Sequence, residues 1–460
     1  MNCKKRVYFC SKIFYLRVLA SLFIFLFSFL GFAQDQKNIV LLDHWTDTTI
    51  VGGYDNAIFN DVWGFAQNGI DYCVIGSNIG SHFFKIENNS LQLVDFKAGK
   101  YQNKYVEHRD YKVYKNYLYA VCDEGTSSLQ IFDLSYLPDS VHKVYDSSLF
   151  FSICHNIFID TLNAKLYASG ANNIGMQVID ITNPILPELN YVFSELPYVH
   201  DCYVRNDTAF LNAGFNGLYV YDFSGDTPTE LGILDFYPNQ GYNHSGWLSP
   251  KGDKYAFIDE TKGTRIKLCT WGEDLSSIAI SETFATFDYA DYVPHNVIIL
   301  DNLAFIAYYN EGFRIFDLHK APFQEIGIYD TFLENTNYKL NGVWGVFVMA
   351  EQNKILISDR QGGLYLFEFP IMVLNQDTEG TFVTSSPFIT ENSVLIPRNN
   401  LQDEQLFFTI STTNGQIVYL QENYLNYVNI PLELSAGTYI YSIYDASHIF
   451  LESGKFIKAN

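Results

Sequence analysis

A five-residue strand pattern recurs seven times along this chain and limits what the chain can fold into. The copies are FFKIE (83–87), LQIFD (129–133), MQVID (176–180), LYVYD (218–222), RIKLC (265–269), FRIFD (313–317) and LYLFE (364–368). Their last residues are 46, 47, 42, 47, 48 and 51 positions apart. Such a period is typical of a repeat architecture, in which each repeat is one structural unit. Glycine stands directly before four of the copies, where a hairpin turn often needs positive φ: Gly175, Gly217, Gly312 and Gly363.

Each repeat has the content of one propeller blade. One short apolar strand precedes each copy, as at 118–121, and after the first six copies another follows, as at 231–235. With the strand that opens the repeat, this makes four short strands in about 40 to 50 residues, and no helical periodicity interrupts them. Four antiparallel strands at this period predict a blade. We therefore predict an all-β chain with a seven-bladed β-propeller over residues 34–370.

The two ends of the repeat region complement each other. After Glu368 the chain reaches Pro370 and loses the pattern, so the seventh repeat lacks a fourth strand. Residues 39–43 match the fourth strands of the other repeats, although they lie near the N-terminus. Residues 39–46 are therefore predicted to complete the last blade, which closes the ring and hides edges that would otherwise pair with other chains.

The first 33 residues have the layout of a secretory signal peptide. Five basic residues precede an almost wholly apolar run at 18–32, which is too short to span a bilayer comfortably. Gly31 and Ala33 supply the small residues of a cleavage site before Gln34. An uncleaved membrane anchor is the alternative. No later stretch is long and apolar enough to span a membrane. We expect a secreted or cell-surface protein, exported through the periplasm of a Gram-negative bacterium, with no transmembrane segment after cleavage.

Charge and cysteine content exclude several classes of partner. The chain has 29 Lys and Arg against 51 Asp and Glu, a net charge of −22, and loss of the five basic residues of the leader would make it −27. An acidic surface repels nucleic acid and anionic lipid, so neither is expected as a partner. The five cysteines beyond the leader have no zinc-site spacing and are expected to be buried apolar residues.

A second marker keeps the phase of the repeat. It lies 22 to 25 residues before the end of each copy and consists of Trp63, His108, His155, His200, His244, His295 and Trp344. Equivalent positions of a closed propeller surround its axis, so we predict that these seven residues meet at one mouth of the channel, with Trp63 beside Trp344. Imidazoles there could hold a divalent metal or bind a polar ligand. They could equally bond to neighbouring blades and have a structural role.

Two functions stay open on the sequence alone. The favoured one is a non-catalytic binding or scaffold module with an unknown ligand at the channel-mouth ring. The alternative is an extracellular hydrolase or lyase that uses this ring, with or without a metal. Carboxylates around the imidazoles would favour the alternative, and imidazoles bonded only to backbone would favour the first. No catalytic residue is assigned, because common nucleophile, zincin and P-loop motifs are absent and the adjacent Asp259 and Glu260 point to opposite faces of a strand.

The propeller region also carries a family resemblance. The recurring pattern resembles the LVIVD repeat, and residues 38–370 resemble the choice-of-anchor B family of exported bacterial propellers, most closely at 242–250 and 257–261. This resemblance implies the fold but no reaction, because one fold hosts many functions.

The last part of the chain is predicted to be a small β-domain. Residues 371–386 have the composition of a linker, and 387–460 alternate as a β-sandwich does, with a hairpin turn at Asn414-Gly415. Leu434, Ala436, Gly437, Tyr439 and the basic ending 454–458 resemble a type A sorting domain of the type IX secretion system of Bacteroidota. The resemblance implies that machinery as a partner. Residues 396–400 depart from the family's usual Asn-Pro turn, and a binding sandwich without an export role is the alternative.

Overall fold

The computed structural model divides into two compact units, residues 1–367 and 368–460, which we treat separately. It describes residues 36–287, 289–300, 302–332, 340–349 and 353–369, and strands β30 to β35 of the second unit. The predicted signal peptide and the predicted linker at 371–386 lie outside this description. No helix in the described part of the chain is long and apolar enough to cross a membrane.

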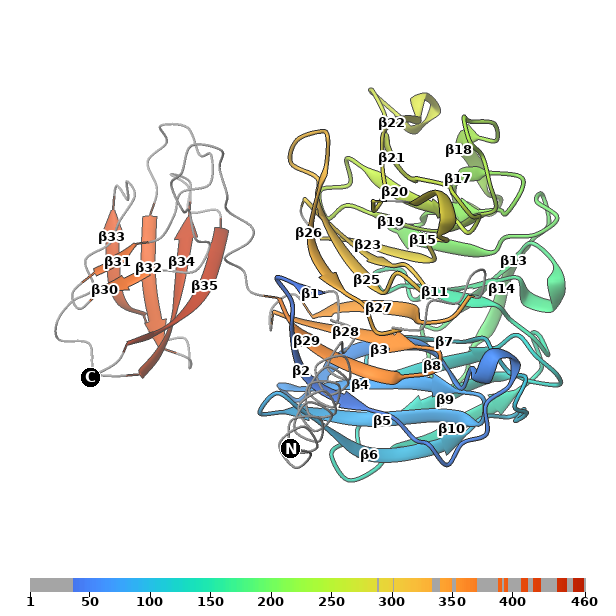
Figure 1. Ribbon diagram of the computed structural model, residues 1–460, viewed down its shortest axis with the longest axis horizontal. Coiled ribbons are helices and arrows are strands. Elements are labelled where there is room, and N and C mark those ends of the chain that lie inside the picture. Colours follow the sequence, from blue (N-terminus) through green and yellow to red (C-terminus); the bar gives the residue numbers. More distant parts are fainter. Residues whose placement is uncertain are drawn as a thin grey trace, which may run out of the picture. The chain divides into compact units, whose positions relative to one another are not determined.

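The first unit is a seven-bladed propeller, as the repeat predicts (Figure 1). From the channel outward, blade 1 consists of β3 (Phe59–Gln67), β4 (Ile70–Ser77), β5 (Gly80–Glu87) and β6 (Ser90–Ala98). Blade 2 consists of β7 (Arg109–Tyr114), β8 (Tyr117–Cys122), β9 (Leu129–Asp133) and β10 (His142–Ser147). Blade 3 consists of β11 (Asn156–Asp160), β12 (Lys165–Ser169), β13 (Met176–Asp180) and β14 (Glu188–Phe193).

The remaining blades follow the same order. Blade 4 consists of β15 (Asp201–Arg205), β16 (Thr208–Asn212), β17 (Leu218–Asp222) and β18 (Thr229–Leu234). Blade 5 consists of β19 (Asn243–Leu248), β20 (Tyr255–Asp259), β21 (Ile266–Thr270) and β22 (Ala279–Phe284). Blade 6 consists of β23 (Asn296–Leu300), β24 (Leu303–Ala307), β25 (Phe313–Asp317) and β26 (Gln324–Tyr329), and blade 7 of β27 (Val343–Met349), β28 (Lys354–Asp359), β29 (Gly363–Glu368) and β2 (Val40–Trp45).

Four short 3₁₀ turns are described in the connections: η1 (Tyr54–Asn56), η2 (Ala171–Asn173), η3 (Leu275–Ser277) and η4 (Tyr289–Asp291). The glycines before the recurring pattern serve mainly as expected. Gly217, Gly312 and Gly363 have φ of 88°, 75° and 104°. Gly175 is the exception, because it is not among the positive-φ residues; a Cβ there would meet the carbonyl oxygen of Phe193 at 2.4 Å.

The recurring pattern forms the third strand of each blade, which neighbouring blades cover on both faces. In β9, four consecutive residues are buried and only the terminal Asp133 is partly exposed. The outermost strand β10, by contrast, has no buried residue. A strand covered on both faces is mostly apolar, although some copies also bury a polar residue such as Gln130 or Arg314. The repeated apolar positions make the pattern conspicuous in the sequence.

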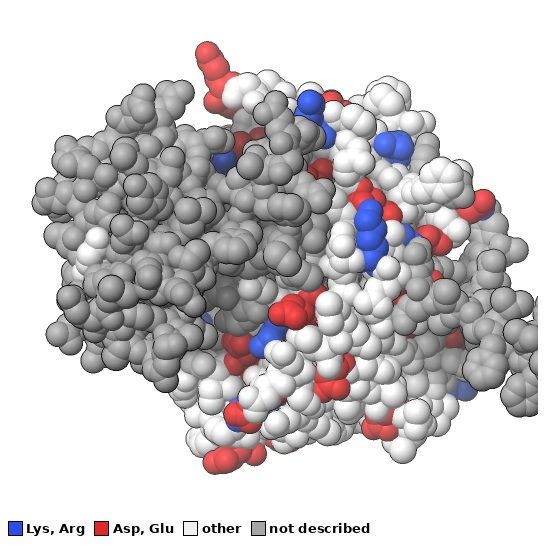
Figure 2. All heavy atoms as spheres, turned by 60° about the vertical axis from the view of Figure 1, so that its left-hand side comes forward, with Lys and Arg blue, Asp and Glu red and all other residues white. Residues whose placement is uncertain are grey.

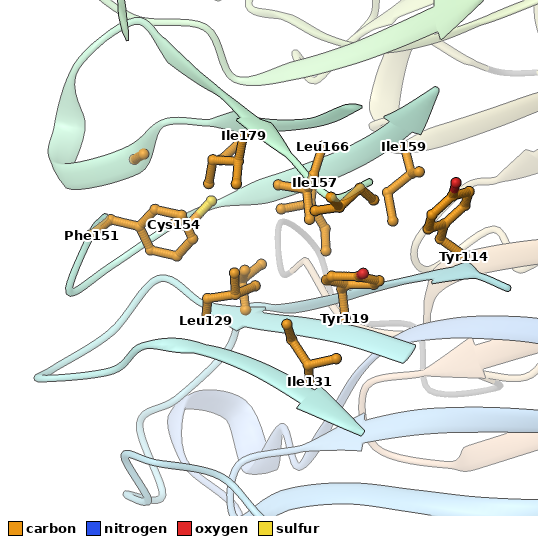
Figure 3. Close-up of a cluster of buried hydrophobic side chains, with 14 of the residues drawn as sticks. Tyr114, Tyr119, Leu129, Ile131, Phe151, Cys154, Ile157, Ile159, Leu166 and Ile179 are labelled. Atoms are coloured by element: carbon orange, nitrogen blue, oxygen red, sulfur yellow. The ribbon is translucent and has the colours of Figure 1, made fainter. Parts of the chain in front are cut away.

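The core lies between the blades as a series of apolar layers. Figure 3 shows one of them, in which Leu129 and Ile131 of blade 2 face Ile157 and Leu166 of blade 3. All four side chains are 0 % exposed. Truncation of such a residue to alanine typically costs about 2–5 kcal/mol of stability, so the stacking of blades stabilises the fold.

The N-terminal segment closes the ring. Strand β2 is hydrogen-bonded to β29 as the outer strand of blade 7, which is where the match of residues 39–46 to the fourth strands places it. In Figure 1, β2 lies beside the last blade. Asp43 of β2 also accepts hydrogen bonds from Ser90 Oγ (2.8 Å) and from the backbone N–H of Leu91 (2.7 Å), both in β6 of blade 1. One segment therefore links the first and last blades.

A second pairing of this segment is not predicted by the sequence pattern. Strand β1 (Gln36–Lys37) pairs with β26, with Gln36 opposite Tyr329 and Lys37 opposite Ile328. Blade 6 therefore has five strands. Two residues are too few to form a recognisable strand pattern, which is why the sequence does not predict this pairing.

The second unit contains a four-stranded antiparallel sheet in the order β33-β32-β34-β35 and a hairpin β30-β31. The strands are β30 (Phe388–Thr390), β31 (Ser393–Leu395), β32 (Phe407–Thr412), β33 (Ile417–Glu422), β34 (Gly437–Tyr444) and β35 (Phe450–Lys458). Strands β32 and β33 flank the predicted Asn414-Gly415 turn and pair with each other. Tyr439 of β34 lies opposite Phe456 of β35, so two of the segments that resemble a sorting domain are neighbours. The complete sandwich stays a prediction.

The surface charge agrees with the acidic composition. On the face shown in Figure 2, Asp and Glu side chains are scattered among uncharged residues, and the few Lys and Arg side chains lie near them. No broad basic patch is visible among the described residues of this face.

Deletion of residues 36–45, which removes β1 and β2, is expected to break the closure of the ring. Unfolding in urea should then begin at a lower concentration and lose its single cooperative step, because blade 7 lacks its outer strand and β29 becomes an open edge. Circular dichroism and tryptophan fluorescence would follow the transition. Deletion of residues 36–38, which removes β1 alone, is the control; identical transitions for the two deletions would contradict a closing role for β2.

Candidate functional site

Five imidazoles and one indole form a closed circuit of contacts around the channel. We call this circuit, made of His108, His155, His200, His244, His295 and Trp344, the histidine ring. The distances between successive ring centroids are 4.9, 4.1, 4.1, 4.5 and 4.3 Å, and Trp344 returns to His108 at 5.3 Å.

The strand arrangement explains this convergence. Each member of the histidine ring lies at or just before the start of the innermost strand of its blade. The innermost strands β3, β7, β11, β15, β19, β23 and β27 contact one another in a closed circle. Residues in the same phase of the repeat therefore meet at the channel end where these strands begin.

Trp63 is not part of the histidine ring, and this corrects the sequence-based prediction. It is the fifth residue of β3 and packs against Phe347, with ring centroids 4.6 Å apart, while Lys112 Nζ lies 4.4 Å from its ring. Strands β3, β4 and β5 have nine, eight and eight residues and are longer than their counterparts in the other blades. A count back from Glu87 therefore ends inside β3 instead of at its start, and Trp63 lies further along the channel. The predicted contact of Trp63 with Trp344 is replaced by that of His108 with Trp344.

Two members of the ring are held by carboxylates that the repeat pattern does not single out. His108 Nδ1 lies 2.6 Å from Glu124 Oε1, and His155 Nδ1 lies 2.8 Å from Asp123 Oδ2. An ionised carboxylate only accepts hydrogen bonds, so Nδ1 of each imidazole is the donor. The lone pair of the neutral ring is then on Nε2.

Two other members are held by the backbone of the next blade. His200 Nδ1 donates to the carbonyl oxygen of His244 (3.0 Å), and His295 Nδ1 donates to that of Trp344 (2.6 Å). A carbonyl oxygen cannot donate, so the proton of each neutral imidazole is again on Nδ1 and Nε2 carries the lone pair.

His244 has a different environment. Its Nε2 lies 3.8 Å from Glu260 Oε2, which is too far for a hydrogen bond. Glu260 is fixed by its other oxygen, because Oε1 accepts a hydrogen bond of 2.5 Å from the hydroxyl of Tyr309. Asp259 points elsewhere, to the buried Lys267 and Tyr237. Adjacent strand residues thus serve different purposes, in agreement with the opposite faces expected from the sequence.

Burial and charge divide the imidazoles by protonation. Burial, with a contribution from neighbouring imidazoles, places the pKa of His200 and of His295 well below the usual value. Burial lowers the pKa of His244 to about 4, although Glu260 opposes this shift. These three rings are neutral at neutral pH. Burial also lowers the pKa of His108, but the hydrogen bond and the charge of Glu124 outweigh it, so the pKa of His108 is raised.

The repeat phase explains where the carboxylates lie. Asp123 directly follows β8, and Glu260 directly follows β20, so both occupy the start of the loop between the second and third strands of a blade. This loop is at the same end of the blade as the start of the innermost strand. A comparison of this loop position among the repeats leads to Asp123 and Glu260. Because only two blades carry an acid there, the position does not stand out as a repeated feature of the sequence.

A second layer of polar groups lines the channel next to the histidine ring. A cavity of about 60 Å³ is bordered by Asp61, Asp110, Asn156, Asp201, Ser245 and Asn296, together with Lys112, Trp63 and Trp247. Lys112 Nζ lies 2.8 Å from Asp110 Oδ1. Burial raises the pKa of Asp201 to about 7, although Lys112 opposes the shift. The ammonium group of Lys112 already neutralises part of this acidic layer, so we assign it no ligand.

Nuclear magnetic resonance titration of the histidines is expected to separate His108 from His244. His108 should take up its proton above the usual imidazole pKa of about 6.5, whereas His244 should stay neutral down to about pH 4. The folded pKa of His244 lies below that of the unfolded chain, so its contribution to the free energy of unfolding falls as the pH drops from about 6.5 to about 4.

The variant Glu124→Gln should lower the pKa of His108, since it removes the carboxylate charge that most opposes the effect of burial, while the weaker charges of Asp123 and Glu107 remain. Glu87→Gln, an exposed carboxylate paired with Lys85, is the control and should leave the His108 titration unchanged. A His108 pKa that is the same in both variants would contradict the assigned role of Glu124.

The chain matches no protein-family model, and a search of curated proteins finds no relative. The resemblances to the LVIVD repeat, to the choice-of-anchor B family and to a type IX sorting domain therefore stay predictions. The fold and the geometry of the histidine ring are the observations on which a function can be argued.

Proposed function

We propose that this protein is an exported binding module and that the histidine ring is its ligand-binding site. The observation that carries the proposal is the ring itself: imidazoles from five consecutive blades meet in one circuit, with Nδ1 of four of them held by hydrogen bonds. His200 and His295 are neutral, and a bond at Nδ1 orients all four of these imidazoles and leaves Nε2 toward a ligand, so the ring is arranged for recognition. Buried groups with shifted pKa values also concentrate at functional sites, and His200, His244 and His295 are such groups.

The export part of the proposal comes from the two ends of the chain. The basic leader and the apolar run at 18–32 support cleavage by a signal peptidase after Ala33. The likeness of Gly437, Tyr439 and the ending 454–458 to a sorting domain supports delivery by the type IX secretion machinery to the cell surface or the medium. In this proposal the propeller binds and the C-terminal unit delivers.

The catalytic alternative has a specific observation in its favour. Asp123, Glu124 and Glu260 lie at the histidine ring, as a hydrolase or lyase with a channel-mouth site would require. His200 and His295, which bond to backbone carbonyls, fit the binding module. Binding is common to both functions. We therefore propose binding as the function and keep extracellular hydrolysis or elimination as the second candidate.

The double variant His200→Ala with His244→Ala tests whether the ring is functional or structural. Residues that a protein keeps for function often contribute little to its stability or reduce it. If the ring is functional, the melting temperature of the double variant should therefore stay nearly unchanged or rise. If the ring were structural, the same variant should lose about 1–3 kcal/mol per buried hydrogen-bonding group, measured by urea denaturation.

His82→Ala is the matched control for this test. His82 is 4 % exposed, bonds to Ser77 Oγ at 2.9 Å and packs on Trp45, so it has the contacts of a structural histidine. Its truncation should lower stability measurably. If the ring variant is destabilised as much as His82→Ala, the ring is structural and the proposed function is wrong.

Truncation after Pro370 tests the delivery part of the proposal. The shortened protein should keep a folded propeller but accumulate in the periplasm of a host that has the type IX machinery, because it lacks the sorting domain. Fractionation of cells and limited proteolysis of the periplasmic protein would show both properties. Normal arrival of the truncated protein at the surface or in the medium would show that the C-terminal unit is not a sorting signal.

A further inference from the structure

We propose that the ligand of the histidine ring is a divalent transition metal, bound at two sites of the same construction, each with a coordination position left open for an oxygen donor. The first triad is His108, Asp123 and His155, and the second triad is His244, Glu260 and His295. This inference rests on the proposed function, because it names the ligand class of the same site.

The two triads repeat one arrangement three blades apart. In each, a histidine and a carboxylate come from one blade, and the second histidine comes from the next blade: blades 2 and 3 for the first triad, blades 5 and 6 for the second. Each carboxylate directly follows the second strand of its blade. Acids of no special role would not be expected at the same repeat position beside two histidines in both places.

The distances suit ligands that share an ion. Within each triad, one ligand atom per residue lies within 4.8 Å of the others. Two ligands of one zinc ion, bound at about 2.0–2.2 Å each, are about 3.3–3.6 Å apart in a tetrahedral site and at most about 4.4 Å apart in any geometry. His244 Nε2 and Glu260 Oε2 are already within this limit at 3.8 Å, a separation that is too long for a hydrogen bond between them. In the first triad, Asp123 Oδ2 and His155 Nδ1 lie 2.8 Å apart, so the ion would replace this hydrogen bond and the imidazole proton would move to Nε2. Small side-chain rotations would bring the remaining ligand atoms into range.

The surroundings orient the ligands. A histidine that binds a metal through one nitrogen usually donates the N–H of the other to a carboxylate or a backbone carbonyl. His108 donates to Glu124, and His295 donates to the carbonyl of Trp344. The hydroxyl of Tyr309 holds Glu260 by Oε1 and leaves Oε2 toward His244.

The donor set indicates the class of metal and of ligand. Two imidazole nitrogens and one carboxylate oxygen suit Zn²⁺, Fe²⁺, Co²⁺ or Ni²⁺ better than Ca²⁺ or Mg²⁺, which prefer oxygen throughout. Three protein ligands are the set of an open site, whose further position takes water or a substrate oxygen. His200 lies between the triads, with its ring centroid 4.1 Å from those of both His155 and His244. It is placed to hydrogen-bond an oxygen ligand held by either ion.

Titration of tag-free, metal-depleted protein with Co²⁺ tests the proposal. Calorimetry and the visible absorption of bound Co²⁺ should show two equivalents. Asp123→Asn with His155→Ala should remove one of them, and Glu260→Gln with His295→Ala should remove the other. Tyr309→Phe should weaken only the second triad, by about 10–100-fold in Kd, as expected for a residue that orients a ligand. His319→Ala, which removes the exposed imidazole beside Asp317, is the control and should keep both equivalents.

Acetohydroxamate is the probe for the open position. It binds metals through two oxygens, so its addition to the Co²⁺-loaded protein should change the absorption spectrum. An unchanged spectrum would show that the coordination is closed and would overturn the inference of an exchangeable position. A single equivalent, or loss of both equivalents in each double variant, would overturn the two-site arrangement.

The outcomes separate this inference from the proposed function. If no Co²⁺ or Zn²⁺ binds below 1 mM, on the order of the weakest specific affinities, while His200→Ala with His244→Ala leaves the melting temperature unchanged, the metal inference is wrong and the ring keeps its role as a site for another ligand. If the double alanine variant is as unstable as His82→Ala and no metal binds, both proposals are wrong.

Discussion

The pairing of β2 with β29 is the interaction on which the rest of the propeller depends. A row of blades with open ends would leave strand edges free to pair with other chains, and its innermost strands would not form a circle. With β2 in place, β27 of blade 7 contacts β3 of blade 1, and positions in the same phase of the repeat must surround one axis. Asp43, which reaches Ser90 and Leu91, adds a bond across the same junction. The histidine ring is therefore a consequence of closure together with repetition.

This dependence explains how much of the molecule can be predicted from its sequence. The strand pattern is visible because the third strand of each blade is covered on both faces, which makes most of its residues apolar. The period then determines the number of blades, and the phase of the histidines places five imidazoles at one channel end. Both inferences use features that occur five to seven times, so an irregularity in one repeat does not affect them.

What the sequence does not predict occurs once or twice. The longer strands of blade 1 occur only in that blade, and they move Trp63 away from the position that counting assigns to it. The two-residue strand β1 leaves no period at all. Asp123 and Glu260 occupy an equivalent loop position in only two of the blades. A residue that departs from the repeat can be placed only with the structure in hand. In this propeller Asp123 and Glu260 are two such residues, and they make the parts of the histidine ring beside them differ from the rest.

That difference decides what kind of ligand the ring suits. Blades 2 to 6 contribute imidazoles, blade 7 contributes the indole of Trp344, and the acids Asp123, Glu124 and Glu260 lie beside the imidazoles. The guanidinium of Arg360 lies over the Trp344 ring at 5.0 Å and forms an ion pair with Glu107. The three acids place negative charge beside the imidazoles, in a chain whose net charge is −22. Such a field attracts cations and repels free anions. An anionic ligand would need a bound cation to hold it. Asp123 and Glu260 would be ligands of such cations, and Glu124 would orient His108. The acidity that argues in the sequence against a nucleic-acid partner thus favours a metal at the ring.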